Sequence, residues 1–162
     1  MARIEIKDLL SSQPIGETVN IKGWVKSSRQ RFVHINDGST INNIQAVLDI
    51  DNMDEELLKR ITVASAVSII GKVVESQGKG QAIEIEAESV EILGDADPEE
   101  VSKTILQPKK HNLDTLREQA HLRFRTNLFG AVFRIRHTVS YAIHKYFNDR
   151  GYYYIHSPII TG

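Results

Sequence analysis

Cysteine is absent from this chain of 162 residues, which excludes disulfide bonds and thiolate chemistry. No apolar run is long enough to span a membrane, and residues 1–10 mix charged and apolar side chains in a way that excludes a signal peptide. We therefore expect a cytoplasmic protein.

Neither sign of charge dominates, since the formal net charge is −1. The chain as a whole is therefore not a basic coat for nucleic acid. Acids nevertheless outnumber bases before about residue 102, and bases outnumber acids from residue 103 onward. Such an asymmetry often accompanies a polyanionic partner.

Five segments have the alternation or apolar run of a strand, and turn signals at 37–39 and 77–80 follow two of them. A short helix, residues 53–61 with Asn52 as its cap, separates the third segment from the fourth. The strand segments are 18–25, 31–36, 44–48, 67–75 and 82–93. This order predicts an all-β, five-stranded OB-fold, a Greek-key barrel that binds oligonucleotides or oligosaccharides on one face.

A different pattern follows the barrel. Residues 94–108 carry acids and two prolines and are typical of a linker, and Asn112 is placed to cap a short helix that ends at residue 118. A long amphipathic helix is predicted over 127–149, with Gly151 as its left-handed cap. Its apolar stripe consists of Leu128, Val132, Ile135, Val139, Ala142 and Tyr146.

Residues 152–160 read as a strand interrupted by Pro158, yet no sheet remains in the sequence to receive it. We therefore expect a fragment of a longer protein. Three parts are predicted: a barrel over 1–102, a hinge with a short helix over 103–125, and the start of a second, α+β domain over 126–162.

The second strand segment carries the functional hypothesis. Strict alternation places Phe32, His34 and Asn36 on one side of that strand. Val33 and Ile35, on the other side, are the better core candidates, so Phe32 faces outward. Lys26 and Arg29 lie close by in the sequence, together with Arg31. An outward ring beside cations offers a single-stranded nucleic acid a stacking surface and partners for its phosphates.

Two other patterns carry no such hypothesis. The sequence Gly-Lys-Gly at 78–80 lacks the spacing and the following helix of a phosphate-binding loop, and it predicts a plain hairpin turn. His137 and His144 lie seven residues apart without carboxylate or cysteine partners at ligand spacing, so we expect no metal site.

Three passages together resemble the asparaginyl-tRNA synthetases, which are class II aminoacyl-tRNA synthetases. Residues 23–47, with Gly-Trp-Val, Asn-Asp-Gly-Ser and Ile-Gln-Ala-Val, resemble the anticodon-binding domain. Residues 110–127 resemble the hinge, and residues 147–161 resemble motif 1, the helix and strand of the dimer interface. The His-Ser-Pro at 156–158 favours the asparagine enzymes over the aspartate and lysine enzymes, which usually carry Glu-Thr-Pro there.

The resemblance implies roles for particular residues. Phe32 would stack on the central anticodon base, Gln45 would read it, and Glu84 would support Gln45, while a solvent-facing strand remains the simpler explanation for Glu86 and Glu88. The remaining anticodon-binding candidates are Lys26, Arg29 and His34. The dimer-interface candidates in motif 1 are Arg150, Gly151, Tyr152 and Pro158, and Pro158 suits an edge strand at such an interface.

The resemblance also implies an activity for the parent enzyme. That enzyme would use ATP and Mg²⁺ to convert asparagine to an adenylate and would then pass the acyl group to its tRNA, as a homodimer. Motifs 2 and 3 are not among these residues, so we expect this chain alone to be inactive and to hold no cofactor.

The sequence departs from the family in a short loop over 27–31 and in Phe124, which replaces a proline. Two alternatives stay open: an aspartyl-type synthetase and a stand-alone single-strand-binding OB protein.

Overall fold

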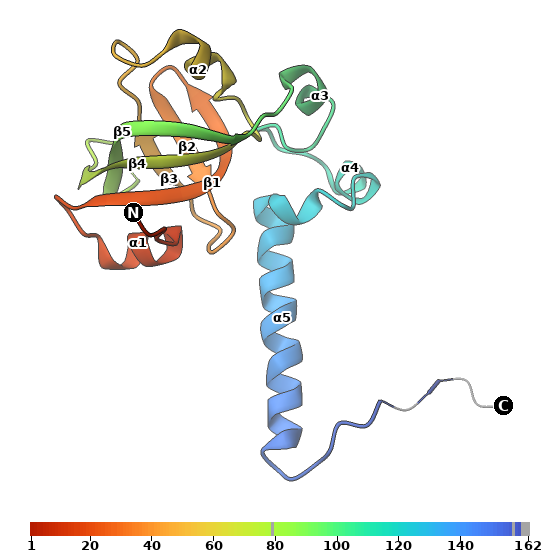
Figure 1. Ribbon diagram of the computed structural model, residues 1–162. Coiled ribbons are helices and arrows are strands. Elements are labelled where there is room, and N and C mark those ends of the chain that lie inside the picture. The colour runs from red at the N-terminus through yellow and green to blue at the C-terminus, as the bar shows by residue number, and fades with distance from the viewer. Residues whose placement is uncertain (79, 157, 160–162) are drawn as a thin grey trace.

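Five strands close into a barrel in the computed structural model, which describes residues 1–78, 80–156 and 158–159 (Figure 1). The spatial order is β1-β2-β3-β5-β4, and β4 pairs with β1 to close the barrel. All neighbouring strands are antiparallel except β3 and β5, which run parallel. The strands are β1 (Thr18–Arg29), β2 (Phe32–Asn36), β3 (Ile44–Val47), β4 (Ala66–Glu75) and β5 (Ile83–Gly94). The predicted OB-fold is confirmed.

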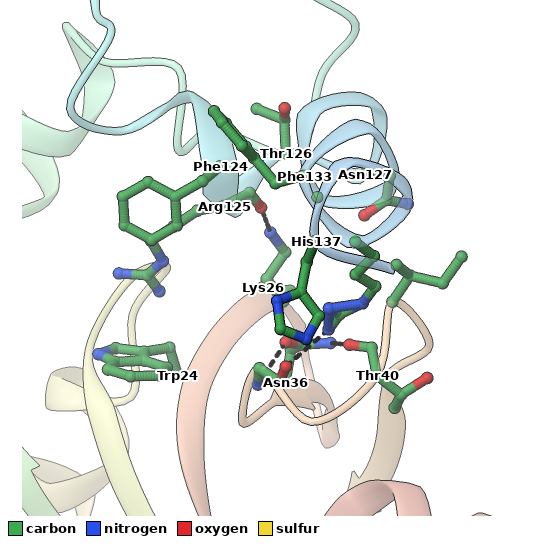
Figure 2. A pocket seen from close by; sticks show the side chains of 14 residues that line it. Trp24, Lys26, Asn36, Thr40, Phe124, Arg125, Thr126, Asn127, Phe133 and His137 are labelled. Atoms are coloured by element: carbon green, nitrogen blue, oxygen red, sulfur yellow. Dashed lines mark hydrogen bonds between the residues drawn. The ribbon is translucent and has the colours of Figure 1, made fainter. Parts of the chain in front are cut away.

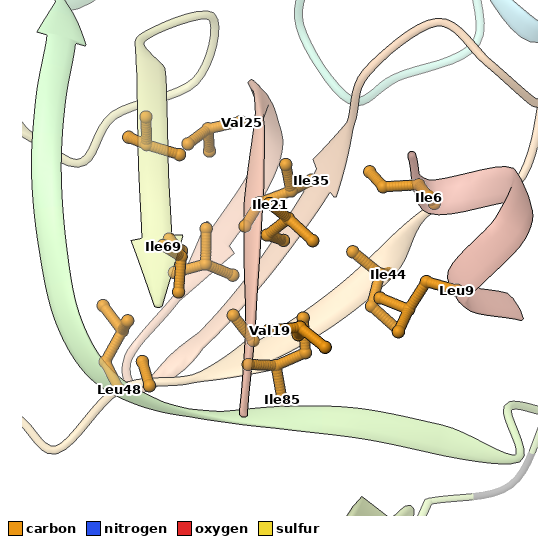
Figure 3. Close-up of a cluster of buried hydrophobic side chains, with 14 of the residues drawn as sticks. Ile6, Leu9, Val19, Ile21, Val25, Ile35, Ile44, Leu48, Ile69 and Ile85 are labelled. Atoms are coloured by element: carbon orange, nitrogen blue, oxygen red, sulfur yellow. The ribbon is translucent and has the colours of Figure 1, made fainter. Parts of the chain in front are cut away.

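Most inward side chains of the strands are valine or isoleucine, and they fill the barrel (Figure 3). Helix α1 (Ile6–Ser12) adds Ile6 and Leu9 to the same core, and both side chains are fully buried. Burying a side chain of this size stabilises a fold by about 1.5–3 kcal/mol. The opposite face is mostly exposed or half-buried, although Asn20, Ser68 and Glu84 are buried there.

The N-terminus of α1 is capped by a turn that is distant in the sequence. Asp37 accepts hydrogen bonds from the Ile6 backbone N–H and from Arg3, each at 3.0 Å, and its side chain is 1% exposed. Ser39 accepts a 3.0 Å bond from the Lys7 backbone N–H and also donates to Asp37. These bonds satisfy backbone donors that a helix end otherwise leaves free. The turn after β2 therefore fixes α1 against the barrel.

Strand β1 is strongly coiled and contacts both β2 and β4. Gly23 lies where β1 crosses close to β2, and a Cβ there would lie 2.7 Å from the Asn36 carbonyl oxygen and 2.8 Å from Ile35 Cγ2. The irregularity in the β1–β2 register falls between Val25 and Ser27. Gly23 is therefore required for close approach of the strands, and the bulge of β1 lies three residues further on, at Lys26.

The segment between the last strand and α5 is more ordered than a linker. It contains α3 (Pro98–Ser102) before the predicted hinge, and α4 (Leu113–Glu118) and the 3₁₀ helix η1 (Arg123–Arg125) within it. Gln119 ties its two halves together, because its side chain accepts from the Ile105 backbone N–H at 2.9 Å and donates to the Lys103 carbonyl oxygen at 3.2 Å. Helix α5 (Asn127–Asn148) then extends away from the barrel (Figure 1).

Several boundaries differ from those predicted. Helix α2 (Glu55–Arg60) is capped by Asp54, which accepts from the Leu57 backbone N–H at 3.1 Å, whereas Asn52 donates to Asp49. Helix α3 lies inside the expected linker. Asn112 and Gly151 have the expected cap geometries.

Residues 152–156 are not a strand, and among the described residues no strand pairs with them. Positions 79, 157 and 160–162, on which the predicted turn and terminal strand partly depended, lie outside the described residues.

Gly23→Ala is expected to lower the free energy of unfolding by about 1–3 kcal/mol, because the added methyl overlaps the Asn36 carbonyl. Urea unfolding followed by circular dichroism measures this. Gly94→Ala is the matched control, since its added Cβ would meet only Ala66 Cβ at 3.6 Å. Equal stability of the two variants would contradict the close-approach explanation.

Asp37 makes stability depend on pH. Burial alone would raise the pKa of this carboxyl, but hydrogen bonds from Ser39, Ile6 and Arg3 outweigh burial and hold the pKa below its ordinary value. Because the pKa of Asp37 is lower in the folded chain than in the unfolded chain, where it is about 3.9, the ionised carboxylate stabilises the fold at pH values above about 3.9. This stabilisation is lost as the pH falls through the pKa of the folded chain.

Asp37→Asn is therefore expected to lower the free energy of unfolding at pH 7 by about 1–3 kcal/mol, and the difference should shrink below about pH 4. Urea titrations at pH 7 and pH 3 give the two values. Asp51→Asn, at an exposed carboxyl, serves as control. A difference that is the same at both pH values would show that the charge of Asp37 is not what stabilises the turn.

Candidate nucleic-acid-binding site

The predicted aromatic ring and several of the predicted polar side chains lie on one outward face of the barrel. Strand pairing places Phe32 opposite Arg29 of β1 and Val47 of β3, and places His34 opposite Gln45. Because paired residues point to the same side of a sheet, these side chains share one surface. Phe32 is 40% exposed, whereas its neighbour Val33 is fully buried. The alternation predicted for β2 is confirmed.

The parallel pairing of β3 with β5 brings Glu84 to the same surface. Ala46 pairs with Ile85 in the register, so the preceding residues Gln45 and Glu84 lie side by side on the outer face. Gln45 Nε2 donates to Glu84 Oε2 at 2.8 Å. Glu84 is only 8% exposed. A carboxylate so covered must be hydrogen-bonded, and here it accepts from Gln45 among others.

His34 is on the same strand as the ring and lies directly opposite the amide in the register. Its Nδ1 is 3.0 Å from Ser27 Oγ, across the β1–β2 pair. Burial lowers the pKa of His34, and the positive charge of Arg29 lowers it further, so the imidazole is neutral at pH 7. A neutral ring offers one donor and one acceptor, and the bond to Ser27 leaves Nε2 for a second partner.

The two predicted cationic residues, Arg29 and Lys26, lie on different parts of the barrel surface. Arg29 is exposed beside Phe32, as predicted. Lys26 is not on this face, because its Nζ donates to the backbone oxygen of Arg125 at 2.6 Å. Burial lowers the pKa of Lys26, and the charge of Arg125 adds to this. The bulge at Lys26 turned it towards the hinge, and a strict alternation could not reveal that.

Lys26 instead lines a cavity of about 560 Å³ between the barrel and the start of α5 (Figure 2). The Arg125 guanidinium lies 4.6 Å from the centroid of the Trp24 ring, within cation–π range. Arg134 of α5 donates to the Gly38 carbonyl oxygen at 2.6 Å. These contacts attach the hinge and α5 to the barrel on a side that leaves the Phe32 face open.

Two residues of the face were missed in the sequence. Ser76 Oγ lies 3.0 Å from Glu84 Oε2, and Gln81 Nε2 lies 3.2 Å from the same oxygen. Both belong to the turn between β4 and β5. Polar residues are ordinary in a turn, so the sequence held no signal that would distinguish them.

The residues predicted to form motif 1 lie at the far end of α5 and beyond it. The Arg150 guanidinium lies 3.6 Å from the centroid of the Tyr146 ring. The rings of Tyr152 and Phe147 pack edge to face, with their centroids 5.7 Å apart. Gly151 has φ +82°, and Pro158 is exposed. The apolar stripe predicted for this helix is exposed as well, so it does not form a core within this chain; it includes Leu128, Val132, Ile135, Val139 and Tyr146.

The described part of the chain, which omits 79, 157 and 160–162, has neither a cluster of metal ligands nor a membrane-spanning helix. No group of three or more histidine, aspartate or glutamate side chains there is arranged to hold a metal ion. No helix among the same residues has the length and apolar character needed to cross a bilayer.

The arrangement fits single-stranded nucleic acid. An exposed ring, an adjacent arginine and a half-buried amide held by a buried carboxylate are groups that can stack on a base, meet its phosphate and read its edge. Residues 19–93 match the family of the OB-fold nucleic acid binding domain. The barrel is thus an OB-fold domain of the nucleic-acid-binding class.

The particular relatives are more specific. The chain is 53% identical over 163 residues to the asparagine–tRNA ligase of Parabacteroides distasonis, covering 98% of this chain and 34% of that protein. It is 51% identical over 168 residues to the asparagine–tRNA ligase of Cytophaga hutchinsonii, covering 100% of this chain and 36% of that protein. By sequence the chain is similar to the asparagine–tRNA ligases over essentially its whole length, and it spans about a third of the length of these relatives.

A solved structure shows the same fold. Asparaginyl-tRNA synthetase from Pyrococcus horikoshii superposes with a TM-score of 0.79 at 19% identity, covering 98% of this chain and 38% of that one. At this identity the likeness concerns the fold alone. It extends through the hinge and α5, because it covers nearly the whole chain.

Proposed function

We propose that the Phe32 face binds the anticodon loop of a tRNA, and that the chain is the anticodon-recognising part of an asparagine–tRNA ligase. The observation that carries the proposal is that Phe32, Gln45 and Glu84 share one outward face. Identity near 50% to asparagine–tRNA ligases over essentially the whole chain favours this function over an aspartyl-type enzyme and over a stand-alone single-strand binder.

Affinity comes from the ring and the cation. A base stacked on Phe32 gains about 1–3 kcal/mol with little preference for its identity, because every base has a flat face. Arg29 is exposed opposite Phe32 in the register and can meet a phosphate of the splayed-out nucleotide. Lys26, which is bonded to the hinge, is not assigned to this task.

Choice of the base comes from the amide and the acid. At the same two ring positions uracil presents a carbonyl acceptor and an N–H donor, whereas cytosine presents an amino donor and a bare nitrogen acceptor. A glutamine amide that could rotate would match both. Glu84 accepts only, so it holds the Nε2 end of Gln45 and fixes the order of donor and acceptor offered to the base. The fixed order selects uracil.

The rest of the proposal concerns the whole protein. The relatives of this chain are asparagine–tRNA ligases. From this similarity, the whole protein would use ATP and Mg²⁺ to activate asparagine before its transfer to tRNA. No residue of this chain is assigned to those steps, so we expect the chain alone to be inactive. The lack of cysteine agrees with a cytoplasmic location.

A homodimer is part of the same proposal. The exposed apolar stripe of α5 supports a two-fold interface there, with Arg150, Gly151, Tyr152 and Pro158 at its end.

Mutation of the ring and of the amide should have different effects. Phe32→Ala is expected to weaken binding of every anticodon hairpin alike, by about 5- to 150-fold, because stacking is tolerant of sequence. Gln45→Ala is expected to abolish discrimination between hairpins with uracil and cytosine at the middle position. Fluorescence anisotropy with both labelled hairpins, at one fixed salt concentration, measures affinity and discrimination together.

Phe124→Ala is the matched control, since Phe124 is also an exposed phenylalanine but lines the hinge cavity instead of this face. It should bind like the unmutated chain. If the unmutated chain binds every hairpin equally, the proposed function is wrong.

A further inference from the structure

The turn between β4 and β5 reaches into the base-reading face. Ser76 Oγ is within hydrogen-bond distance of three groups: the Gly78 backbone N–H at 3.1 Å, Gln81 Nε2 at 2.9 Å and Glu84 Oε2 at 3.0 Å. Glu84 Oε2 is in turn shared by Ser76, Gln81 and Gln45. One carboxylate oxygen therefore connects the turn to the amide that faces the base.

The direction of each hydrogen bond follows from the chemistry of these groups. A backbone N–H and an amide NH₂ can only donate, so Ser76 Oγ accepts from Gly78 and from Gln81. Its two lone pairs are then used, and its single O–H is free to donate to Glu84. An ionised carboxylate only accepts, so Gln45 must present Nε2 to Glu84 and its Oε1 to the other side.

We propose that Ser76 and Gln81 are positioning residues for base recognition: they fix Glu84, and through Glu84 they fix which end of the Gln45 amide faces the base. The proposal rests on the proposed function of the face. Neither residue needs to touch the base, since the effect passes through the oxygen that all three donors share. The turn thereby contributes to the choice between uracil and cytosine.

The closed network explains why both residues are needed. Without the Ser76 hydroxyl, Gln81 loses its nearer partner and Glu84 loses its O–H donor. A largely buried carboxylate with too few donors moves towards water or towards another donor, because an unsatisfied buried charge is costly. Gln45 can then rotate and match cytosine. The affinity from stacking on Phe32 is unaffected.

The test uses Ser76→Ala and Gln81→Ala in the 162-residue chain, with labelled anticodon hairpins that carry uracil or cytosine at the middle position. Each variant is expected to reduce the ratio of the two affinities by about ten-fold, while affinity for the uracil hairpin falls by less than about three-fold. Ser76→Thr keeps the hydroxyl and should restore the ratio. Gln77→Ala, at an exposed residue of the same turn, should leave it unchanged.

A second readout does not depend on RNA. The side-chain NH₂ signals of Gln45 should shift in nitrogen–proton NMR spectra of Ser76→Ala and of Gln81→Ala, and should stay in place in Ser76→Thr. A purely structural role for the turn would lower both affinities equally and leave the ratio intact.

The outcomes separate the two proposals. If the unmutated chain discriminates and Phe32→Ala weakens both hairpins, but Ser76→Ala and Gln81→Ala keep the full ratio, the positioning role is wrong and the proposed function stands. If the unmutated chain shows no discrimination, the proposed function fails and the positioning role fails with it.

Discussion

The parallel pairing of β3 with β5 is the constraint on which the site depends. Gln45 and Glu84 are 39 residues apart, and only closure of the barrel brings Nε2 of one to 2.8 Å from Oε2 of the other. The same closure buries one face of every strand and leaves Phe32 exposed on the opposite face. The stability of the barrel and the geometry of its reading face are therefore set by one strand register.

The outer surface of the barrel is divided between two tasks. Phe32, His34 and Gln45 form an open face that is suited to a base, whereas Trp24 and Lys26 of the same β1–β2 region bind the hinge. A single bulge separates the tasks, since it turns Lys26 away while Ser27 stays opposite His34. Arg125 and Arg134 complete the attachment on the hinge side. The face proposed to bind RNA is thus separate from the contact between the barrel and the hinge.

Much of the barrel follows from local sequence, because alternation in β2 is a property of five consecutive residues and places Phe32 outward without further information. The pairing of Gln45 with Glu84 is not local, and only the resemblance to a family singled it out. Lys26 was misplaced because a bulge leaves no mark in an alternating pattern. Helix α3 was missed because its Asp97 cap and Pro98 also suit a linker, and Ser76 because a turn serine is unremarkable.

The central claim is that a splayed-out base lies on Phe32 within reach of Gln45. Nuclear Overhauser contacts between an isotope-labelled chain and an anticodon hairpin test it most directly. The account predicts contacts from the Phe32 ring protons to H5 and H6 of the middle uracil, and from the Gln45 side-chain NH₂ to the same base. Contacts from that base to the hinge or to α5, with none to Phe32, would contradict it.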